Sequence, residues 1–452
     1  MEKIGPVLSP FVTVPVLVRF VRNSGRSAAP YRSLLIAGAV CLASFAAFWI
    51  AQRAAGVSMI DLRVYRAEGL TVLEGRDLYA MRATAARLPT TYPPFAALLF
   101  TPLTLPSVPV LRTLATAGNL LLLVVFVRLS LRLVLQGKTP PPKEETGKEK
   151  EPEEAAVPWA ATLWVAAFAV WCEPVWTTLR YGQINLLLAV AVLWDLCPKD
   201  PGDTARGRRW AGAGIGLAAA VKLTPALFAV LLLLIGVVRA RRAGWNPWLR
   251  QAATAGGVFA GTTLLAAALL PGDSRRYWTG VVFEAARAGR AEDTANQSLR
   301  GVLARLLHTT DPGLWWPVAA VVVAGAGLTA AVLAALRGER AGAVAACAAT
   351  ALLISPVSWS HHWVWCVPVV LFLAARGGTG HGATGWAAAF WLVFCSYALW
   401  WVPHGSGAPE LAQGATEMTL SALYPLTALA LICRLLGKTV GARGYGQAVA
   451  NE

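Results

Sequence analysis

The stretch LLIAGAVCLASFAAFWIAQRA, residues 34–54, decides the fold class of this chain. Arg53 is its only charged residue, and a helix needs about 20 apolar residues to cross the hydrocarbon core of a bilayer. The preceding residues, 1–32, mix Pro, Arg and Ser with apolar residues and lack a small-residue cleavage site, so we expect no cleaved signal peptide. Residues 34–54 are therefore predicted to stay in the membrane as an anchor.

Composition extends this prediction to the whole chain. Of its 452 residues, 56% are hydrophobic and only 14% are charged, which is too apolar for an ordinary soluble protein of this size. We predict an all-α polytopic membrane protein with about 12 transmembrane helices and with amphipathic or short helices in its outer loops. After a second apolar region reaching residue 135, the others lie near 159–176, 185–196, 210–221, 225–238, 252–270, 314–336, 341–354, 363–375, 386–401 and 419–433.

The formal charge of +16 indicates how the chain is oriented in the membrane rather than a nucleic-acid partner, because the basic residues lie mainly between apolar runs. Lys and Arg gather in alternate connections, which the positive-inside rule makes cytoplasmic. We therefore expect a multi-pass protein of the cell (inner) membrane with both termini in the cytoplasm. Three segments follow: a cytoplasmic 1–33, a transmembrane catalytic domain over 34–436 with a disordered cytoplasmic loop at 137–158, and a cytoplasmic tail at 437–452.

With that orientation, the unusual polar residues fall on the extracytoplasmic side of the membrane. They are Asp61, 92–95, 180–185, Lys222, 296–300 and 355–362. Polar groups at membrane helix ends are costly unless they meet water, a partner or a substrate, so a one-sided group indicates a site. The seven cysteines lack paired metal-ligand spacing, and we expect neither a metal nor a cofactor.

Asp61, in Asp61-Leu-Arg-Val-Tyr65, follows the first span, where its carboxylate could take a proton from an acceptor hydroxyl. The alternative is a helix cap or an ion pair with Arg63 or Arg66. Lys222 is the only charged residue in an apolar stretch, so its ammonium could bind a phosphate. The alternative is that its side chain extends to the membrane–water interface.

The other candidates are amides, imidazoles and a guanidinium. His361 or His362 suits a phosphate oxygen or a proton transfer, although adjacent residues on a helix point in different directions. Asn296, Gln297 and Arg300 suit sugar hydroxyls and phosphate, but such polar loops are also common.

In order, the segments 61–65, 75–79, 92–95, 182–185, 221–225, 296–298 and 355–362 resemble one family, glycosyltransferase family 87. The resemblance implies a GT-C-type membrane enzyme like the actinobacterial polyprenol-phosphate-mannose-dependent α-(1,2)-mannosyltransferases. It implies that Asp61 is the general base, and that His361 or His362 helps to hold the donor phosphate. We take Lys222, Arg300, Asn296, Gln297, Gln183, Asn185 and Tyr92 as further candidates for binding the donor phosphate or sugar.

The predicted reaction moves one mannosyl residue from polyprenyl phosphate mannose to a hydroxyl of a glycolipid or lipoglycan outside the membrane, with inversion. A polyprenyl-phosphate arabinofuranosyltransferase is a second possibility, because the motifs imply a sugar attached to a lipid phosphate but do not specify that the sugar is mannose. The alternative from another class is a lipid-linked sugar transporter or flippase, for which polar residues should cluster at the bilayer midplane and the two halves should repeat. We find neither pattern.

Overall fold

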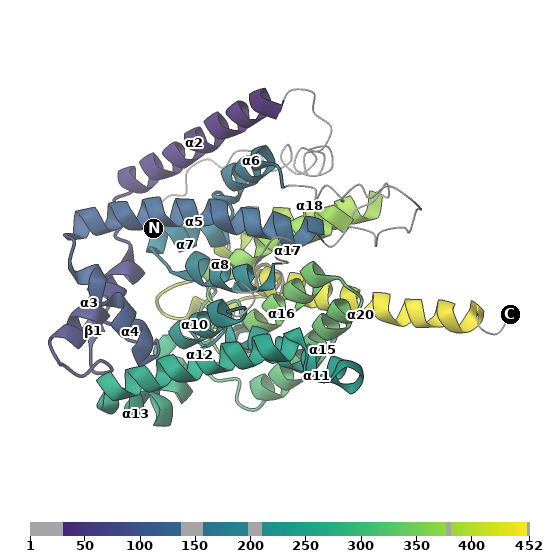
Figure 1. The fold of residues 1–452 in the computed structure, drawn as a ribbon. Coiled ribbons are helices and arrows are strands. Elements are labelled where there is room, and N and C mark those ends of the chain that lie inside the picture. The colour runs from purple at the N-terminus through teal and green to yellow at the C-terminus, as the bar shows by residue number, and fades with distance from the viewer. Residues whose placement is uncertain (1–29, 137–156, 198–209, 377–380, 450–452) are drawn as a thin grey trace.

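The computed structural model describes residues 30–136, 157–197, 210–376 and 381–449 and is built almost entirely of helices (Figure 1). The long helices are α2 (Pro30–Ala54), α5 (Val108–Gln136), α11 (Ala226–Ala243), α12 (Pro247–Leu269), α15 (Trp315–Leu336) and α20 (Leu423–Val449). One continuous apolar core joins them. In the described residues the only sheet is a two-stranded antiparallel hairpin of β1 (Arg82–Ala83) and β2 (Leu88–Pro89).

Shorter helices fill the interior and one end of the bundle. Those packed among the long helices are α6 (Trp159–Ala169), α7 (Glu173–Tyr181), α8 (Asn185–Leu196), α10 (Ala213–Val221), α16 (Arg340–Ile354), α17 (Cys366–Arg376) and α18 (His381–Cys395). The connections add α3 (Ile60–Leu73), α4 (Pro94–Phe100), α13 (Pro271–Thr279), α14 (Leu299–Leu306), α19 (Ala415–Ser421), η1 (Thr101–Thr104), η2 (Val281–Phe283), η3 (Ala285–Ala288), η4 (Ser360–Trp365), η5 (Ala398–Trp400) and η6 (Pro409–Ala412).

The connecting elements are not spread evenly over the molecule. In Figure 1, α3, the hairpin, α4 and α13 gather at the left end of the bundle, and α20 carries the C-terminus out at the right end. Helix α12 spans between the two ends, because its first residue follows α11 and its last precedes α13. The bundle therefore has one end rich in short elements.

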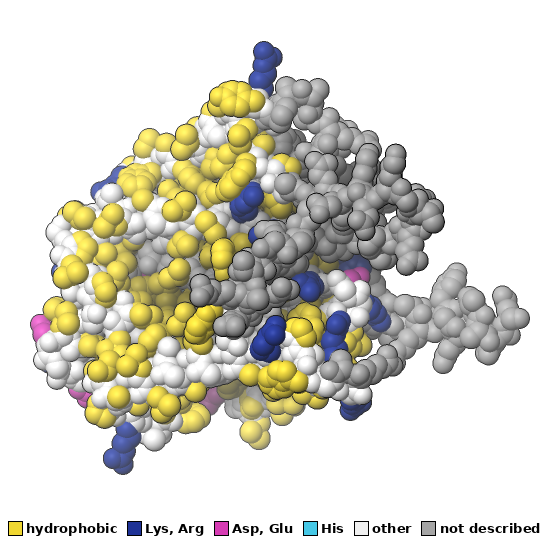
Figure 2. Space-filling model, viewed as in Figure 1, with side chains coloured by type: hydrophobic (Ala, Val, Ile, Leu, Met, Phe, Trp, Pro, Cys, Tyr) yellow, Lys and Arg dark blue, Asp and Glu magenta, His cyan; other side chains and the backbone are white. Residues whose placement is uncertain are grey.

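The surface is that of a membrane protein. Hydrophobic side chains dominate the face in Figure 2, and large exposed ones follow α2, α12 and α15, among them Leu42, Leu264 and Val321. Soluble proteins rarely expose such large contiguous apolar surfaces. The predicted all-α, multi-pass membrane class is thereby confirmed.

Four described helices are long and apolar enough to cross a membrane: Tyr31–Ala54, Val108–Leu135, Pro247–Leu269 and Trp315–Leu336. Two bent helix pairs raise the number to six if each pair is one span. Other predicted crossings fall on apolar helices of 10–17 residues, such as α6 and α16. The figure of about twelve crossings stays a prediction.

The sequence prediction of one apolar segment over 159–176 needs correction, because two helices occupy it. Helix α6 ends at Ala169, and α7 begins at Glu173 after Cys172, whose backbone is extended. Pro174 lies in the first turn of α7, where its missing N–H does no harm, but it cannot continue α6. The predicted loop at 137–158 and the segment 1–33 lie mostly outside the described residues, whereas most of the predicted tail at 437–452 belongs to α20, which ends at Val449.

A second break separates α7 from α8, and the two helices meet at 118°. Gly182 ends α7 with φ +68°, a left-handed conformation that glycine adopts at little cost. A Cβ atom there would lie 2.8 Å from Cβ of Leu62 on α3. The break therefore depends on glycine both for its backbone angle and for its contact with α3.

We predict that Gly182→Ala destabilises the protein by about 2–4 kcal/mol, because it combines left-handed strain with steric overlap. Gly56→Ala is the matched control, since Gly56 has φ +60° but a Cβ added there would meet no atom within 4 Å, and it should cost about 1 kcal/mol. Heat unfolding in detergent, followed by tryptophan fluorescence, measures both. Equal losses would contradict a special role for the Gly182–Leu62 contact.

Candidate active site

Asp61 lies in the first turn of α3 and bonds across to the α7–α8 break. Nε2–H of Gln183 donates to Oδ2 of Asp61 over 2.7 Å. The predicted alternatives do not describe its contacts: Met59 is the N-cap of α3, and the Arg66 guanidinium donates to the Thr104 carbonyl. Asp61 thus faces a neighbouring element rather than capping its own helix.

Two tyrosines hold Gln183 in this orientation. The Tyr65 hydroxyl donates to Oε1 of Gln183 over 2.6 Å, and the Tyr92 hydroxyl lies 3.0 Å from that of Tyr65. Because Oε1 accepts from Tyr65, the amide N–H of Gln183 must point at Asp61. Tyr65 follows Asp61 by one helical turn, so α3 supplies both groups.

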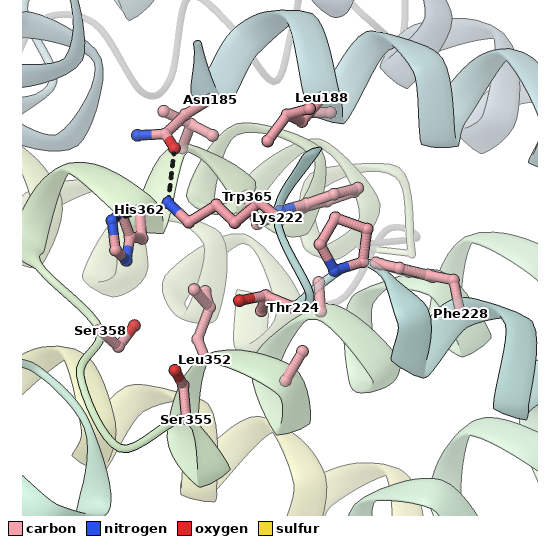
Figure 3. A pocket seen from close by; sticks show the side chains of 15 residues that line it. Asn185, Leu188, Lys222, Thr224, Phe228, Leu352, Ser355, Ser358, His362 and Trp365 are labelled. Carbon is pink, nitrogen blue, oxygen red and sulfur yellow. Dashed lines mark hydrogen bonds between the residues drawn. The ribbon is translucent and has the colours of Figure 1, made fainter. Parts of the chain in front are cut away.

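Lys222 lies on the other side of the break, between α10 and α11 (Figure 3). Its Nζ donates to Oδ1 of Asn185 over 3.2 Å and lies 2.9 Å from Nε2 of His362. The Tyr92 ring is 5.8 Å from the same Nζ. Gln183 and Asn185 are two residues apart, so a single three-residue turn connects the Asp61 group to the Lys222 group.

A pocket opens beside Lys222 and encloses about 510 Å³ of atom-free space, including its open mouth. Its polar lining comes from Lys222, His362, Asn185, Thr224, Ser355 and Ser358; in Figure 3 the amine of Lys222 lies between Asn185 and His362, and Leu352 lies among the two serines and Thr224. The rest of the lining is apolar: Leu188, Ala189, Pro225, Phe228, Ala348, Ala351, Leu352, Val364 and Trp365. Such a pocket matches a ligand with a polar head and a hydrocarbon tail.

The two adjacent histidines have different surroundings. The ring of His362 lines the pocket, and its Nδ1 accepts from the Trp359 backbone N–H over 3.2 Å. His361 is 6% exposed, and its ring packs edge-on against Tyr181. The His361 backbone carbonyl accepts from Thr178 and Asn185, so this residue fixes the segment to α7 and α8.

Asn296 and Gln297 are fully buried, and the N–H groups of both amides donate to backbone carbonyls. Oδ1 of Asn296 accepts from the Ser358 N–H, and Nε2 of Gln297 donates to the Thr294 and Ser421 carbonyls. Together they anchor the segment that precedes η4, where Asn296 and Trp359 form an isolated antiparallel bridge. Arg300 points elsewhere, with its guanidinium 6.0 Å from the Trp316 ring. Sugar or phosphate binding by these three stays a prediction.

Two buried carboxyl groups were not predicted from the sequence. Glu173 is completely buried and accepts from four side chains, which come from α7, η4, η5 and α20: Thr177, Ser360, Trp400 and Tyr424. Glu68 lies two turns after Asp61 on α3, also completely buried. A lone Glu beside a proline in an apolar stretch was the available signal for Glu173, but only the fold assembles its four donors.

Burial shifts the charges of the site toward neutrality. Desolvation raises the pKa of Asp61 to about 6, against the opposing effects of the Gln183 hydrogen bond and Lys222. It lowers the pKa of Lys222 to about 7, against the attraction of Asp61. Desolvation also raises the pKa of Glu68 to about 8, so that this carboxyl group is mostly protonated at pH 7. In the described ranges no three His, Cys, Asp or Glu side chains gather as a metal site.

Comparison with known proteins identifies relatives. The profile of glycosyltransferase family 87 matches residues 91–356. A polyprenol-phosphate-mannose-dependent alpha-(1-2)-phosphatidylinositol pentamannoside mannosyltransferase of Mycobacterium tuberculosis is 34% identical over 357 residues, covering 77% of this chain and 73% of the relative. A polyprenol-phosphate-mannose-dependent alpha-(1-2)-phosphatidylinositol mannoside mannosyltransferase of Mycolicibacterium smegmatis is 37% identical over 331 residues, covering 70% and 69%.

Among solved structures, ArnT from Cupriavidus metallidurans bound to undecaprenyl phosphate aligns with 94% of this chain and 80% of its own. The TM-score is 0.42 and the sequence identity is 15%.

We predict that Glu173→Leu destabilises the protein by more than about 3 kcal/mol, because four donors, three of them buried, lose their acceptor together. Tyr424→Phe is the single-donor control and should cost about 1–2 kcal/mol. Heat unfolding of both variants in the same detergent gives the comparison. A Glu173→Leu protein as stable as Tyr424→Phe would show that the four bonds do not act as one junction.

Proposed function

This chain belongs to glycosyltransferase family 87, and from that premise we propose that it transfers a mannosyl residue from polyprenyl phosphate mannose to a hydroxyl of a phosphatidylinositol mannoside. The donor and the acceptor are those in the names of the two relatives. The observation that carries the proposal is the pocket beside Lys222, whose polar and apolar lining residues fit a phosphate attached to a hydrocarbon chain.

In this proposal the donor phosphate lies against Lys222, His362 and Asn185, and the first units of its polyprenyl chain lie along Phe228, Leu352 and Trp365. The mannosyl group then extends toward the α7–α8 break and Asp61. Gln183 and Asn185 lie on the two sides of the path from the phosphate to Asp61, because Gln183 bonds to Asp61 and Asn185 bonds to Lys222. The GT-C-type architecture expected from the sequence belongs to the same proposal.

The reaction is a single displacement at the anomeric carbon. Asp61 accepts the proton of the acceptor hydroxyl while the hydroxyl oxygen bonds to that carbon. The bond between the anomeric carbon and the phosphate oxygen breaks, its electron pair stays with the phosphate, and polyprenyl phosphate leaves. Attack from the opposite face inverts a β-linked donor into an α-linked product.

Electrostatics support this assignment of roles. A carboxylate whose pKa is about 6 is ionised at pH 7, yet it accepts a proton more readily than an ordinary Asp. The departing phosphate gains negative charge, which donors already in place next to it stabilise without reorganisation. Lys222 and His362 are two of the donors that line the pocket.

We place this site on the extracytoplasmic side and both termini in the cytoplasm. The short elements α3, α4 and α13 gather at the end of the bundle opposite the exit of α20 (Figure 1). Arg239 lies near the end of α11, and Arg337 directly follows α15; both belong to basic stretches that the positive-inside rule assigns to the cytoplasm. Asp61, on α3, belongs to the opposite end.

The names of the relatives favour mannose over arabinofuranose as the transferred sugar. A transporter or flippase remains the alternative from another class, and a transfer assay separates it from an enzyme. Purified protein in lipid, given radiolabelled polyprenyl phosphate mannose and a phosphatidylinositol mannoside, should yield a labelled glycolipid with one more mannose. A protein that moves the donor across the bilayer without forming that product would support the alternative.

We predict that Asp61→Asn lowers the transfer rate by at least about 100-fold, because the amide cannot accept the hydroxyl proton. The variant keeps the size of the side chain and an oxygen that can accept from Gln183. Its unfolding temperature serves as the control for folding. Wild-type rates in a folded Asp61→Asn protein would remove this residue from the role of base.

We also predict a pH dependence of the transfer rate at saturating donor. Because Asp61 acts in its ionised form and its pKa is about 6, the rate should fall about tenfold per pH unit below pH 6. Glu68→Gln should keep the same acidic limb, since Glu68 is already protonated in this range. A rate that stays constant from pH 7 to pH 5 would contradict the prediction.

A further inference from the structure

A directional chain of hydrogen bonds runs through the Lys222 group, and both of its ends are backbone groups. At one end the Trp359 N–H donates to Nδ1 of His362 over 3.2 Å. At the other end the His361 carbonyl accepts from Nδ2 of Asn185 over 2.9 Å. A backbone N–H can only donate and a carbonyl can only accept, so the direction of every bond between them is fixed.

The imidazole proton is assigned first. Nδ1 of His362 accepts from Trp359, so it carries no hydrogen, and in a neutral imidazole the proton must then lie on Nε2. Burial is the main reason that the pKa of His362 lies well below its usual value, so the ring is neutral. Nε2 is therefore a donor, and it points at Nζ of Lys222 over 2.9 Å.

The orientation of the Asn185 amide follows from the other end of the hydrogen-bond chain, the His361 carbonyl. Because Nδ2 donates to the His361 carbonyl, Oδ1 must face Lys222, and Nζ donates to it over 3.2 Å. Nζ thus donates to Asn185 and accepts from His362. An ammonium has three N–H groups and no lone pair, so it cannot accept, whereas an amine has two N–H groups and one lone pair.

We propose that Lys222 is an uncharged amine in the empty site and takes up one proton from solvent when the donor phosphate binds. This inference rests on the proposed function, because it assumes that the ligand is a lipid phosphate. On protonation Nζ loses its lone pair, and the bond from Nε2–H of His362 breaks. Nε2–H is then free to donate to a phosphate oxygen beside the new ammonium, so that one proton supplies two donors to the ligand.

The surroundings of Lys222 agree with an amine that gains a proton easily. Its pKa of about 7 follows mainly from burial, which disfavours the ammonium. The groups that face it are Asp61 from α3, the Tyr92 ring before α4, and His361 and His362 from η4. Helix α8 contributes the neutral Asn185. A phosphate adds the negative charge that raises the pKa of Lys222 further.

Proton uptake makes donor affinity depend on pH. Above pH 7 the empty site is mostly unprotonated and must take up a proton to bind the donor. Because the proton concentration falls tenfold per pH unit, the dissociation constant for the donor should rise about tenfold between pH 7.5 and pH 8.5. The donor is a phosphodiester with one negative charge throughout this range, so it contributes no proton change. When polyprenyl phosphate leaves, the ammonium returns its proton to solvent.

The test is isothermal titration of full-length protein in nanodiscs with polyprenyl phosphate mannose and no acceptor. At pH 8, titrations in buffers of different ionisation enthalpy give the number of protons taken up on binding. We expect close to one proton for the wild type and a value near zero at pH 6. Donor binding at pH 8 without proton uptake would overturn the inference while leaving the proposed function intact.

Three variants identify the group that gains the proton. Lys222→Arg carries a permanent charge and should bind without uptake, with an affinity that does not change from pH 7.5 to pH 8.5. Lys222→Met should also show no uptake, with weaker binding at pH 6. Asp61→Asn should keep the full uptake, and its loss there, or its persistence in Lys222→Arg, would assign the proton elsewhere and overturn the inference. A wild type that transfers no mannose and does not bind the donor would instead refute the proposed function itself.

Discussion

The break between α7 and α8 is the constraint on which the rest of the site depends. Gly182 takes a left-handed angle and packs against Leu62, which brings the turn onto α3. The two polar residues that follow then point to different partners, Gln183 to Asp61 and Asn185 to Lys222. If this segment were one straight helix, Gln183 and Asn185 would both project from the same helix axis, and at least one of them would lie too far from its partner, Asp61 or Lys222.

Around the break the protein fixes polar groups by hydrogen bonds rather than by ion pairs. Glu173 accepts from four neutral donors, which ties η4 and the start of α7 to α20 without a cation. Asp61 and Lys222 are each satisfied by an amide. A strong Asp61–Lys222 ion pair would hold both groups in their charged forms and facing each other. Neutral partners leave the carboxylate available to a hydroxyl and the lysine available to a phosphate.

The sequence predicted the membrane class and the helix Asn185–Leu196, and it indicated Asp61, Lys222 and the pair His361 and His362 as site candidates, because each is a local signal: an apolar run, or a polar group where polarity is costly. It did not predict the break at 170–172 or the role of Glu173, since these depend on contacts between distant segments. It could not choose between His361 and His362, because the choice depends on the η4 backbone. Asn296 and Gln297 attract attention as polar residues in a loop, but only the fold reveals that backbone groups occupy their amides.

In the proposed mechanism the α7–α8 break joins two half-sites, one that binds the donor phosphate and one that removes the acceptor proton. The most direct measurement is the affinity for polyprenyl phosphate mannose at pH 7, without acceptor, in the wild type, Asp61→Asn and Lys222→Met. We expect Asp61→Asn to bind the donor within about threefold of the wild type, and Lys222→Met to bind it at least about tenfold more weakly, since a charge-assisted bond contributes about 1.5–3 kcal/mol. Undiminished binding by Lys222→Met, or binding lost to the same degree in both folded variants, would contradict the division of the site into these two halves.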